Sequence, residues 1–479
     1  MFKKLKLQHT AGFFLLLLFS LAAGQPISDT DIWWHLRVGR YIWQNSMIPG
    51  TDPFSFSNMG HLWITHEWLS EVIYYLSYQY GNLYGLVTVN LLLLCLVFTI
   101  LYRITVLRTG RPFMSIVLTV VAAVLSSPFW VYRPHMFGYA GFMAYIYILE
   151  HYKKGRSKLL WCLPLIMVFW VNAHGSYIIG LVLIGIYLVS GLVKKGPGGT
   201  EAEPWTREQA RNLAFSLAAS FAITFLNPNT YKMVIYPFFT IGNSNIVDKI
   251  NEWSSPDFHE PVFQVFLVVV LAGFLLTAVY EGRHRISDLL LLAAFTGLAL
   301  FAVRNIALYL FACTPVLGYY LSGLIRPRAD HRQYYAVNWL LALVIAFAIF
   351  ISWPAKNDLS AHQDTSVFPA GAVKYLAENR IEGDIFNDYN WGGYLLWYRY
   401  PDNRVFIDGR TDIYADRVFP DYLKVMNLSP GNMEILEDYG PDLILIKTGA
   451  ALNGILIKRP EWKVIYSDSI SVIYKRAEG

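Results

Sequence analysis

The chain has 479 residues, of which 55% are hydrophobic and only 15% are charged. A soluble domain is typically about one quarter charged, so this composition excludes an ordinary soluble protein and predicts a chain surrounded largely by lipid. The net charge of +5 requires no nucleic-acid partner, because Lys and Arg are interleaved between apolar runs and form no single basic patch.

Apolar runs along the chain predict about eleven transmembrane helices, and therefore a polytopic α-helical membrane domain over residues 1–353. Several runs are shorter than the ~20 residues that cross a bilayer, so their polar flanks must belong to the helices. The first run also suits a cleaved signal peptide, but we favour a retained anchor because the following loop needs one. The runs are 11–24, 83–102, 113–131, 137–151, 159–171, 177–193, 213–226, 262–280, 289–303, 306–322 and 337–353.

The basic residues predict the orientation of these helices. Lys and Arg gather in alternate connecting segments, namely 3–6, 103–111, 153–158, 194–211, 283–285 and 326–332. Cytoplasmic segments carry such an excess, so the N-terminus is predicted to lie inside the cell. Before the last run, the intervening segments hold only Arg37, Arg40, Arg133, Lys232, Lys249 and Arg304.

The polar segment 354–479 follows the last apolar run and is predicted to be an extracytoplasmic α/β domain. Its apolar periodicity predicts helices at 372–379, 392–398 and 433–439. Strands are predicted at 384–387, 404–408 and 442–447, followed by a hairpin over 463–475.

Polar side chains near the bilayer concentrate on the predicted outer face, and ionisable residues at a membrane are usually functional. The first outer loop, 25–82, is also rich in aromatic residues, which we expect mostly at the headgroup level, with a groove for a polyprenyl chain or a sugar face as the alternative. The outer polar residues are Asp29, Asp31, His35, His66, Glu67, Arg133, His135, Asn172, His174, Asn227, Glu252, His259, Glu260, Arg304 and Asn305.

Short motifs in these outer segments resemble those of the GT-C-fold membrane glycosyltransferases. Asp31 and His35, followed by Gly39-Arg40 and Pro49, are similar to the first-loop motif of that superfamily. The run 63–69 resembles the second half of that loop in aminoarabinose transferases and protein mannosyltransferases, although His66 stands where the former have a lysine. Ile32 stands where many relatives have a second acid. The run 388–394 is similar to the Trp-Trp-Asp-Tyr-Gly region of oligosaccharyltransferase catalytic subunits.

The resemblance implies a glycosyltransferase of the cell (inner or plasma) membrane. Such an enzyme moves a sugar from a polyprenyl-phosphate-linked donor to a glycan, lipid or protein acceptor at the extracytoplasmic face. The acceptor hydroxyl needs a general base, and the leaving phosphate needs positive charge. By resemblance the base is Asp31, with Asp29 in support. The structural alternatives are a helix cap for Asp31 and a turn for Asp29.

Other residues are expected to bind donor or acceptor, each with a structural alternative. Arg133 and Arg304 lie at outer turns, where an arginine can grip a lipid phosphate or reach to the headgroups. The alternatives are a satisfied helix end for His174, a turn pair for Asp408 with Arg410, and ordinary packing for Trp391. A divalent cation is left open, with Asp29, Asp31 and His66 as its ligands. The binding residues are His35, Arg40, His66, Glu67, Arg133, His135, His174, Arg304, Trp391, Asp408 and Arg410.

Two other functional classes predict different sequence features. A transporter or flippase of lipid-linked sugars should show inverted repeats and ionisable residues at mid-bilayer. The chain shows no such repeat, and its ionisable residues lie at one face. A non-catalytic scaffold of an envelope assembly complex is also compatible with the sequence, because the two first-loop acids could serve only as caps.

Overall fold

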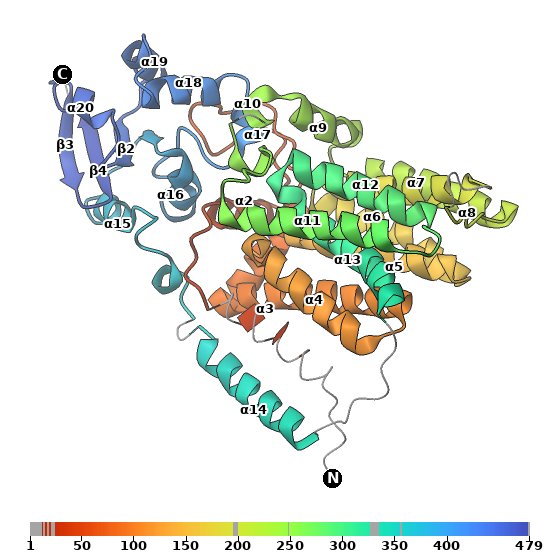
Figure 1. Ribbon diagram of the computed structural model, residues 1–479. Coiled ribbons are helices and arrows are strands. Elements are labelled where there is room, and N and C mark those ends of the chain that lie inside the picture. Colours follow the sequence, from red (N-terminus) through yellow and green to blue (C-terminus); the bar gives the residue numbers. More distant parts are fainter. Residues whose placement is uncertain are drawn as a thin grey trace. The chain divides into compact units, whose positions relative to one another are not determined.

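The computed structural model describes residues 12, 15–16, 19–20, 24–194, 200–247, 249–325, 335–354 and 357–477. Helices dominate, and a small sheet lies near the C-terminus (Figure 1). The chain divides into two compact units. The first comprises Met1–Gln25, Val87–Thr230 and Ile250–Ala355, and the second comprises Pro26–Leu86, Tyr231–Lys249 and Lys356–Gly479. The first outer loop therefore groups with the C-terminal segment.

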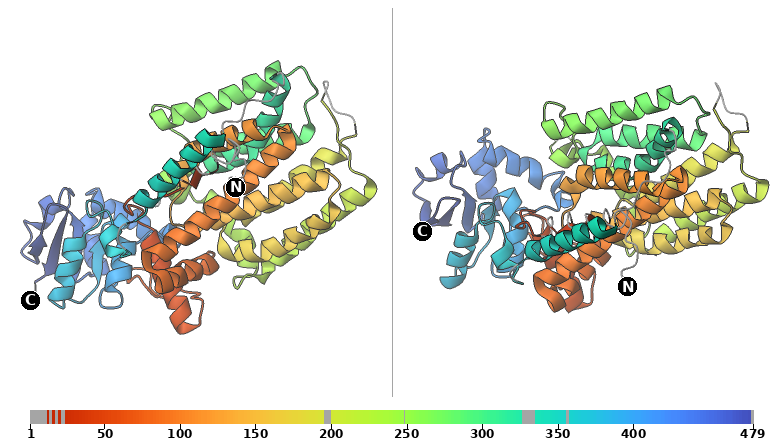
Figure 2. Two further views of the ribbon diagram at one scale, coloured as in Figure 1. Left: turned by 90° about the horizontal axis from the view of Figure 1, so that it is seen from below. Right: turned by 60° about the horizontal axis from the view of Figure 1, so that its bottom comes forward.

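The first unit is a bundle of apolar helices that lie side by side in the views of Figure 2. Helix α12 packs on α13, α13 on α4, and α5 on both α6 and α7. The bounds are α4 Pro112–Ser126, α5 His135–Lys153, α6 Cys162–Ala173, α7 Tyr177–Leu192, α8 Arg207–Ile223, α11 Pro261–Val279, α12 Ile286–Phe301, α13 Ile306–Leu324 and α14 Tyr335–Ser352. Helix α3, Trp68–Thr109, has a non-helical residue, Asn82, near its middle and contributes to both units.

Among the described residues, four helices are long and apolar enough to cross a membrane: Trp68–Thr109, Pro112–Phe129, Pro261–Val279 and Val303–Leu324. Only 17% of the most apolar window of Pro261–Val279 is buried inside the protein, as expected for a helix that faces lipid. Ten of the predicted apolar runs coincide with helices, whereas run 11–24 lies mostly outside the described residues. The prediction of a helical membrane protein is confirmed, and the number of spans stays a prediction.

A buried ionic network fastens three helices of the first unit. The Arg108 guanidinium on α3 donates to both Glu150 oxygens, at 2.6 and 3.0 Å, and to Asp288 Oδ1 at 2.6 Å. Tyr187 donates to the same Glu150 carboxylate. Buried charges need such pairing, so the network favours one arrangement of α3, α5 and α12.

The second unit has shorter helices and one mixed sheet. Strands β1 and β2 pair in parallel, and β4 pairs antiparallel with β2 and β3, which gives the order β1-β2-β4-β3. The helices are α2 Ile32–Asn45, α9 Tyr231–Gly242, α10 Ser244–Val247, α15 Ala370–Glu378, α16 Gly392–Arg399, α17 Thr411–Tyr414, α18 Val418–Met426, α19 Asn432–Tyr439 and α20 Asn453–Leu456. The strands are β1 Ile385–Asn387, β2 Leu443–Lys447, β3 Trp462–Ser467 and β4 Ser471–Arg476.

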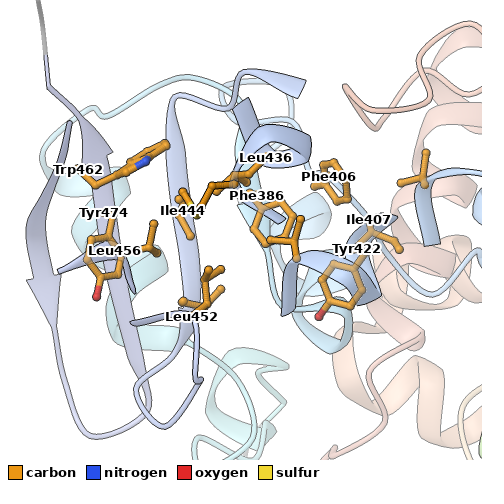
Figure 3. Packing of buried hydrophobic residues seen from close by; sticks show 14 of the residues in the cluster. Phe386, Phe406, Ile407, Tyr422, Leu436, Ile444, Leu452, Leu456, Trp462 and Tyr474 are labelled. Carbon is orange, nitrogen blue, oxygen red and sulfur yellow. The ribbon is translucent and has the colours of Figure 1, made fainter. Parts of the chain in front are cut away.

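One face of the sheet carries a compact hydrophobic core (Figure 3). Phe386 of β1, Ile444 of β2 and Tyr474 of β4 contribute to it, and α18 and α19 cover them with Tyr422 and Leu436. All five side chains are at most 6% exposed. The predicted helices at 372–379, 392–398 and 433–439 and the hairpin over 463–475 are confirmed.

The predicted strand at 404–408 is wrong, because the side chain of Asn387 takes the place of a strand ladder. Its amide accepts from Phe406 N at 2.9 Å and donates to Ile407 O at 2.8 Å. Backbone pairing is limited to isolated bridges from Val405 to Ser55 and to Ile385. This irregular segment leads into the loop Asp408–Asp412, which contributes to the candidate site.

Several first-loop aromatic residues expected at the headgroup level are instead buried in the protein. Trp33 is 0% exposed, and its ring meets the rings of Phe368 and Tyr394 edge to face. Trp63 and Tyr74 are also fully enclosed. Helix α2 packs its aromatic face against α16, so these residues form a protein interface.

Candidate functional site

The loop Asp408–Asp412 is anchored by a buried arginine. Arg410 donates to both oxygens of Asp408, at 2.6 and 2.8 Å, and to Asp52 Oδ1 at 2.7 Å. Its guanidinium also lies over the Trp63 ring, at 4.7 Å from the centroid. Arg410 is 2% exposed and Asp408 0%. The pair therefore has the geometry of the turn alternative, and it fixes the loop that follows.

The start of α2 lies against this loop. A Cβ built on Gly409 would stand 2.2 Å from Asp31 Oδ1 and 2.7 Å from Trp34 Nε1. Trp34 is 6% exposed, and its Nε1 has no hydrogen-bond partner among the described residues. A carboxylate and a buried N–H donor thus meet the same glycine, a pairing that suits a hydroxyl ligand.

The two first-loop acids have different roles at the helix start. Asp31 is the N-cap of α2, but its side chain makes no capping hydrogen bond to the helix. Asp29 Oδ1 instead accepts from Asp31 N at 3.0 Å, which is the turn alternative for Asp29. Asp29 therefore shapes the backbone that carries Asp31.

One turn further along α2, a histidine meets two carboxylates of the α3 start. His35 Nδ1 lies 3.3 Å from Glu71 Oε1 and 3.9 Å from Glu67 Oε2. The two helices cross closely there, because a Cβ on Gly39 would stand 2.1 Å from the Glu71 carbonyl oxygen. Within the described ranges, His35, Glu67 and Glu71 form a group with metal-ligand spacing, which Asp29, Asp31 and His66 do not.

A second imidazole extends the group towards Asp412. His66 Nε2 lies 3.5 Å from Glu67 Oε1 and 3.4 Å from the Tyr236 hydroxyl, which donates to Asp412 Oδ2 at 3.3 Å. Burial raises the pKa of Asp412 to about 6, with His66 and Arg410 opposing the shift. Burial alone would lower the pKa of His66, but the neighbouring Glu67 carboxylate outweighs it and the pKa is raised. Titration near neutral pH is the property expected of an acid–base site.

Two other predicted binding residues of this unit lie in packing positions. Trp391 is 0% exposed, and its Nε1 donates to Val367 O at 2.8 Å, which matches the packing alternative. Arg40 lies over the Trp397 ring at 6.0 Å from the centroid. Neither residue is among the contacts of the acid and histidine cluster given above.

In the first unit, two arginines flank a short polar turn. Arg133 Nη1 pairs with Glu252 Oε1 at 2.6 Å, and the Arg304 guanidinium lies over the neighbouring Trp253 ring at 4.5 Å. Glu252 is about half exposed, so the turn is open to solvent or headgroups. The residue pairs join segments far apart in the sequence, and they gather positive charge at one place in the bundle.

The two predicted histidines of this unit make local hydrogen bonds. His135 Nε2 lies 2.9 Å from Phe129 O, and His174 Nδ1 lies 2.7 Å from Ser176 Oγ. His174 stands at the C-cap of α6, as in its helix-end alternative. Their rings are 6.4 Å apart, so the two positions adjoin.

The sequence reasoning missed four members of the cluster: Asp52, Glu71, Tyr236 and Asp412. Glu71 could have been found, since it follows Glu67 by four residues and so shares its helix face. Asp412 ends the motif that holds Asp408 and Arg410. Tyr236 carried no signal, because α9 lies between apolar runs and resembles another membrane-associated helix.

No family model matches the chain, and no curated protein matches it either. Solved structures do match. The Archaeoglobus fulgidus oligosaccharyltransferase tethered with an acceptor peptide containing the NVT sequon is similar over 97% of this chain and 74% of its own, with a TM-score of 0.58 at 10% identity. ArnT from Cupriavidus metallidurans, bound to undecaprenyl phosphate, is similar over 97% of this chain and 96% of its own, with a TM-score of 0.53 at 12% identity.

Arabinofuranosyltransferase AftD from Mycobacteria also matches 98% of this chain, which spans 41% of AftD, with a TM-score of 0.53 at 14% identity. All three are GT-C-fold glycosyltransferases. The predicted resemblance to the GT-C fold is thereby confirmed over most of the chain.

Proposed function

We propose that this protein transfers a sugar from a polyprenyl-phosphate-linked donor to a cell-envelope acceptor (a glycan, a lipid or a protein). The proposal is supported by the shared GT-C fold and by the ligands of two similar structures, undecaprenyl phosphate in ArnT and an acceptor peptide in the oligosaccharyltransferase. Transfer takes place at the extracytoplasmic face of the cell membrane, with the N-terminus in the cytoplasm, as the distribution of Lys and Arg favours.

The observation that carries the proposal is that the Asp31 carboxylate and the Trp34 indole N–H both lie next to Gly409. An acceptor hydroxyl bound there donates its hydrogen to the Asp31 carboxylate while its oxygen accepts from Trp34 Nε1. Asp31 takes the proton as the hydroxyl oxygen attacks the anomeric carbon, and the bond from that carbon to the phosphate oxygen breaks. Gly409 permits the close approach of Asp31 and Trp34 to this loop, because a Cβ there would overlap Asp31 Oδ1 and Trp34 Nε1.

We assign the binding of a lipid phosphate to Arg133 and Arg304 of the first unit. A guanidinium presents several donors in a plane and can hold a phosphate through two hydrogen bonds. Glu252 keeps Arg133 in place, and Trp253 supports Arg304 from its ring face. A divalent cation is part of the proposal as well, because the Archaeoglobus fulgidus enzyme is also described in complex with Zn and sulfate.

Lipid-linked sugars in cells that lack the protein provide the test. We expect a polyprenyl-phosphate sugar to accumulate, and mass spectrometry of the lipid extract then identifies the donor. Wild-type protein should clear it, whereas Asp31→Asn should be inserted in the membrane normally and leave it in place. Asp438→Asn, at an exposed position, serves as the matched control. Full clearance by Asp31→Asn would refute the assigned base, and an unchanged lipid profile in the deletion strain would refute the transfer itself.

A further inference from the structure

We propose that helix α9, Tyr231–Gly242, lies along the outer surface of the lipid bilayer and buries its exposed apolar face among the lipids. The surface belongs to the second unit and is separate from the position of Asp31 and Gly409, to which proton transfer was assigned. The inference rests on the proposed function only for the side of the membrane. Contact with lipid can be measured without sugar transfer, so the two can fail separately.

Helix α9 has two unlike faces. Met233 and Thr240 lie on the face that is turned into the protein, where they are 0% and 7% exposed. The opposite face carries large apolar side chains at helical spacing, each between 45% and 67% exposed. A helix with such a one-sided apolar stripe buries that stripe against a partner. The side chains of the stripe are Tyr231, Ile235, Phe238, Phe239 and Ile241.

The charge of this segment favours a lipid partner. Residues 231–247 contain no Asp or Glu, and Lys232 is their one charged residue. It directly follows Tyr231 at the edge of the stripe. A lysine at such an edge extends its ammonium group to the lipid phosphates, and tyrosine is enriched at the same level of the membrane. A segment without carboxylates is also not repelled by anionic headgroups.

The chain on both sides of α9 also leads into apolar helices of the first unit. Upstream, the short link 227–230 follows Phe225 and Leu226, which are 42% and 65% exposed at the end of a predicted membrane run. Downstream, α11 begins at Pro261, and only 17% of its most apolar window is buried inside the protein. The upstream link is too short to carry α9 far from the membrane surface.

The size of the stripe argues against a second copy of the chain as its partner. Large apolar side chains that are about half exposed offer roughly 100 Å² each, so the stripe provides on the order of 500 Å². A stable interface between two proteins takes about 800 Å² from each partner. A bilayer, in contrast, accommodates an apolar stripe of any size.

The polar side of this region is hydrogen-bonded to the segment that follows the Asp408–Asp412 loop, and α9 and α10 lie near α17 in Figure 1. Asn243 Nδ2 donates to Asp416 Oδ1, and Asn245 Nδ2 donates to the carbonyl oxygen of Ala415, both at 3.0 Å. These bonds add to the contact between Tyr236 and Asp412. The lipid contact of α9 would therefore hold this loop at the level of the headgroups.

Fluorescence quenching of the full-length protein in nanodiscs tests the surface. Cys95→Ala, Cys162→Ala and Cys313→Ala first remove every native thiol, and Phe238→Cys is then labelled with the environment-sensitive fluorophore NBD. The nanodiscs contain phosphatidylcholine and phosphatidylglycerol, with or without a phosphatidylcholine that carries a doxyl quencher near the start of its acyl chain. We expect a blue-shifted emission and a large loss of fluorescence with the doxyl lipid, because the label lies at the interface.

Ile457→Cys is the matched control. Ile457 is 70% exposed, against 67% for Phe238, but it follows α20 and lies outside α9. Its label should keep its fluorescence with the doxyl lipid. Size-exclusion elution verifies that each variant is folded, and Ile235→Cys takes the place of Phe238→Cys if the latter does not fold. Adding Asp31→Asn should abolish transfer and leave the quenching unchanged, which separates the lipid contact from the proposed reaction.

Three results would overturn the inference. The label at position 238 could emit as it does in water and show no quenching, in which case the stripe faces solvent. It could be blue-shifted yet unquenched by the doxyl lipid, in which case a protein covers it. The label at position 457 could be quenched equally, in which case α9 has no particular contact with the bilayer.

Discussion

The carboxylate of Asp31 lies directly in front of the Cα of Gly409, with room for no side chain between them. A Cβ at Gly409 would stand 2.2 Å from Asp31 Oδ1, far inside van der Waals contact. Residues from the first loop and from the C-terminal segment thus meet at one position, and the absence of a side chain at Gly409 is what lets the Asp31 carboxylate approach the loop so closely.

Gly409→Ala should therefore reduce sugar transfer strongly while the protein still folds. The new methyl group displaces Asp31 or Trp34, and a misplacement of about 1 Å can cost on the order of a hundredfold in rate. Clearance of the accumulated lipid-linked sugar measures the loss. Gly449→Ala is the matched control, because nothing lies within 4 Å of its added Cβ. Normal clearance by Gly409→Ala would show that the reaction occurs elsewhere.

Arg410→Leu should destabilise the second unit, because it leaves two buried carboxylates, Asp52 and Asp408, without their counter-ion. Breaking a buried ion pair from one side costs about 3–5 kcal/mol. Thermal unfolding of the full-length protein in detergent should show a clear drop in midpoint. Adding Asp52→Asn and Asp408→Asn should recover part of that loss, and the exposed Lys458→Leu should have no effect. An unchanged midpoint in Arg410→Leu would mean that the residue serves ligand binding instead.

The stability of the second unit should fall as pH rises from about 4 to 6, through Asp412. Its pKa is raised by burial from 3.8 in the unfolded chain to about 6 in the folded protein. The folded state therefore holds the proton more tightly, and this contribution is complete below pH 3.8 and lost as pH passes about 6. His66, with its raised pKa, acts in the same direction at higher pH.

Unfolding midpoints at a series of pH values separate this contribution from the rest. The side chain of Asp412→Asn cannot titrate. The midpoint of this variant should therefore rise relative to that of the wild type as pH increases to about 6, and above that pH the difference should stay constant. Asp438→Asn, an exposed acid, should follow the wild type. If the midpoints of Asp412→Asn and of the wild type differed by the same amount at every pH, Asp412 would not have a raised pKa in the folded protein.

Much of the helical architecture could be predicted from the sequence, because apolar runs longer than a few turns have few alternatives in a membrane protein. The C-terminal helices and the hairpin followed from periodicity in the same way. The strand at 404–408 could not be rejected, since Val405, Phe406 and Ile407 form a short apolar run that is typical of a buried strand. The structure shows that the segment is irregular: it pairs with Ile385 through one isolated bridge, and the Asn387 amide binds Phe406 and Ile407 where a longer ladder would continue.

The site was partly predictable for a similar reason. Asp31 and His66 stand in motifs with a known superfamily pattern, whereas Tyr236 acts through a contact with residues 170 and 176 positions away. Such a long-range partner cannot be predicted from a local sequence pattern. The roles of Asp408 and Arg410 were equally hidden, because the turn pair becomes a buried anchor only through Asp52, which precedes it by 358 positions.

The large sequence separation between Asp52 and Arg410 also delays their pairing during synthesis of the chain. A ribosome adds about 5–20 residues per second, so roughly 20–70 seconds pass between the synthesis of these two partners. During that interval the first loop is already synthesised, and the α2 face that carries Trp33 still lacks its packing partner α16. The newborn chain must therefore shield an aromatic surface until its last quarter arrives, and assembly of the site is among the final steps of its maturation.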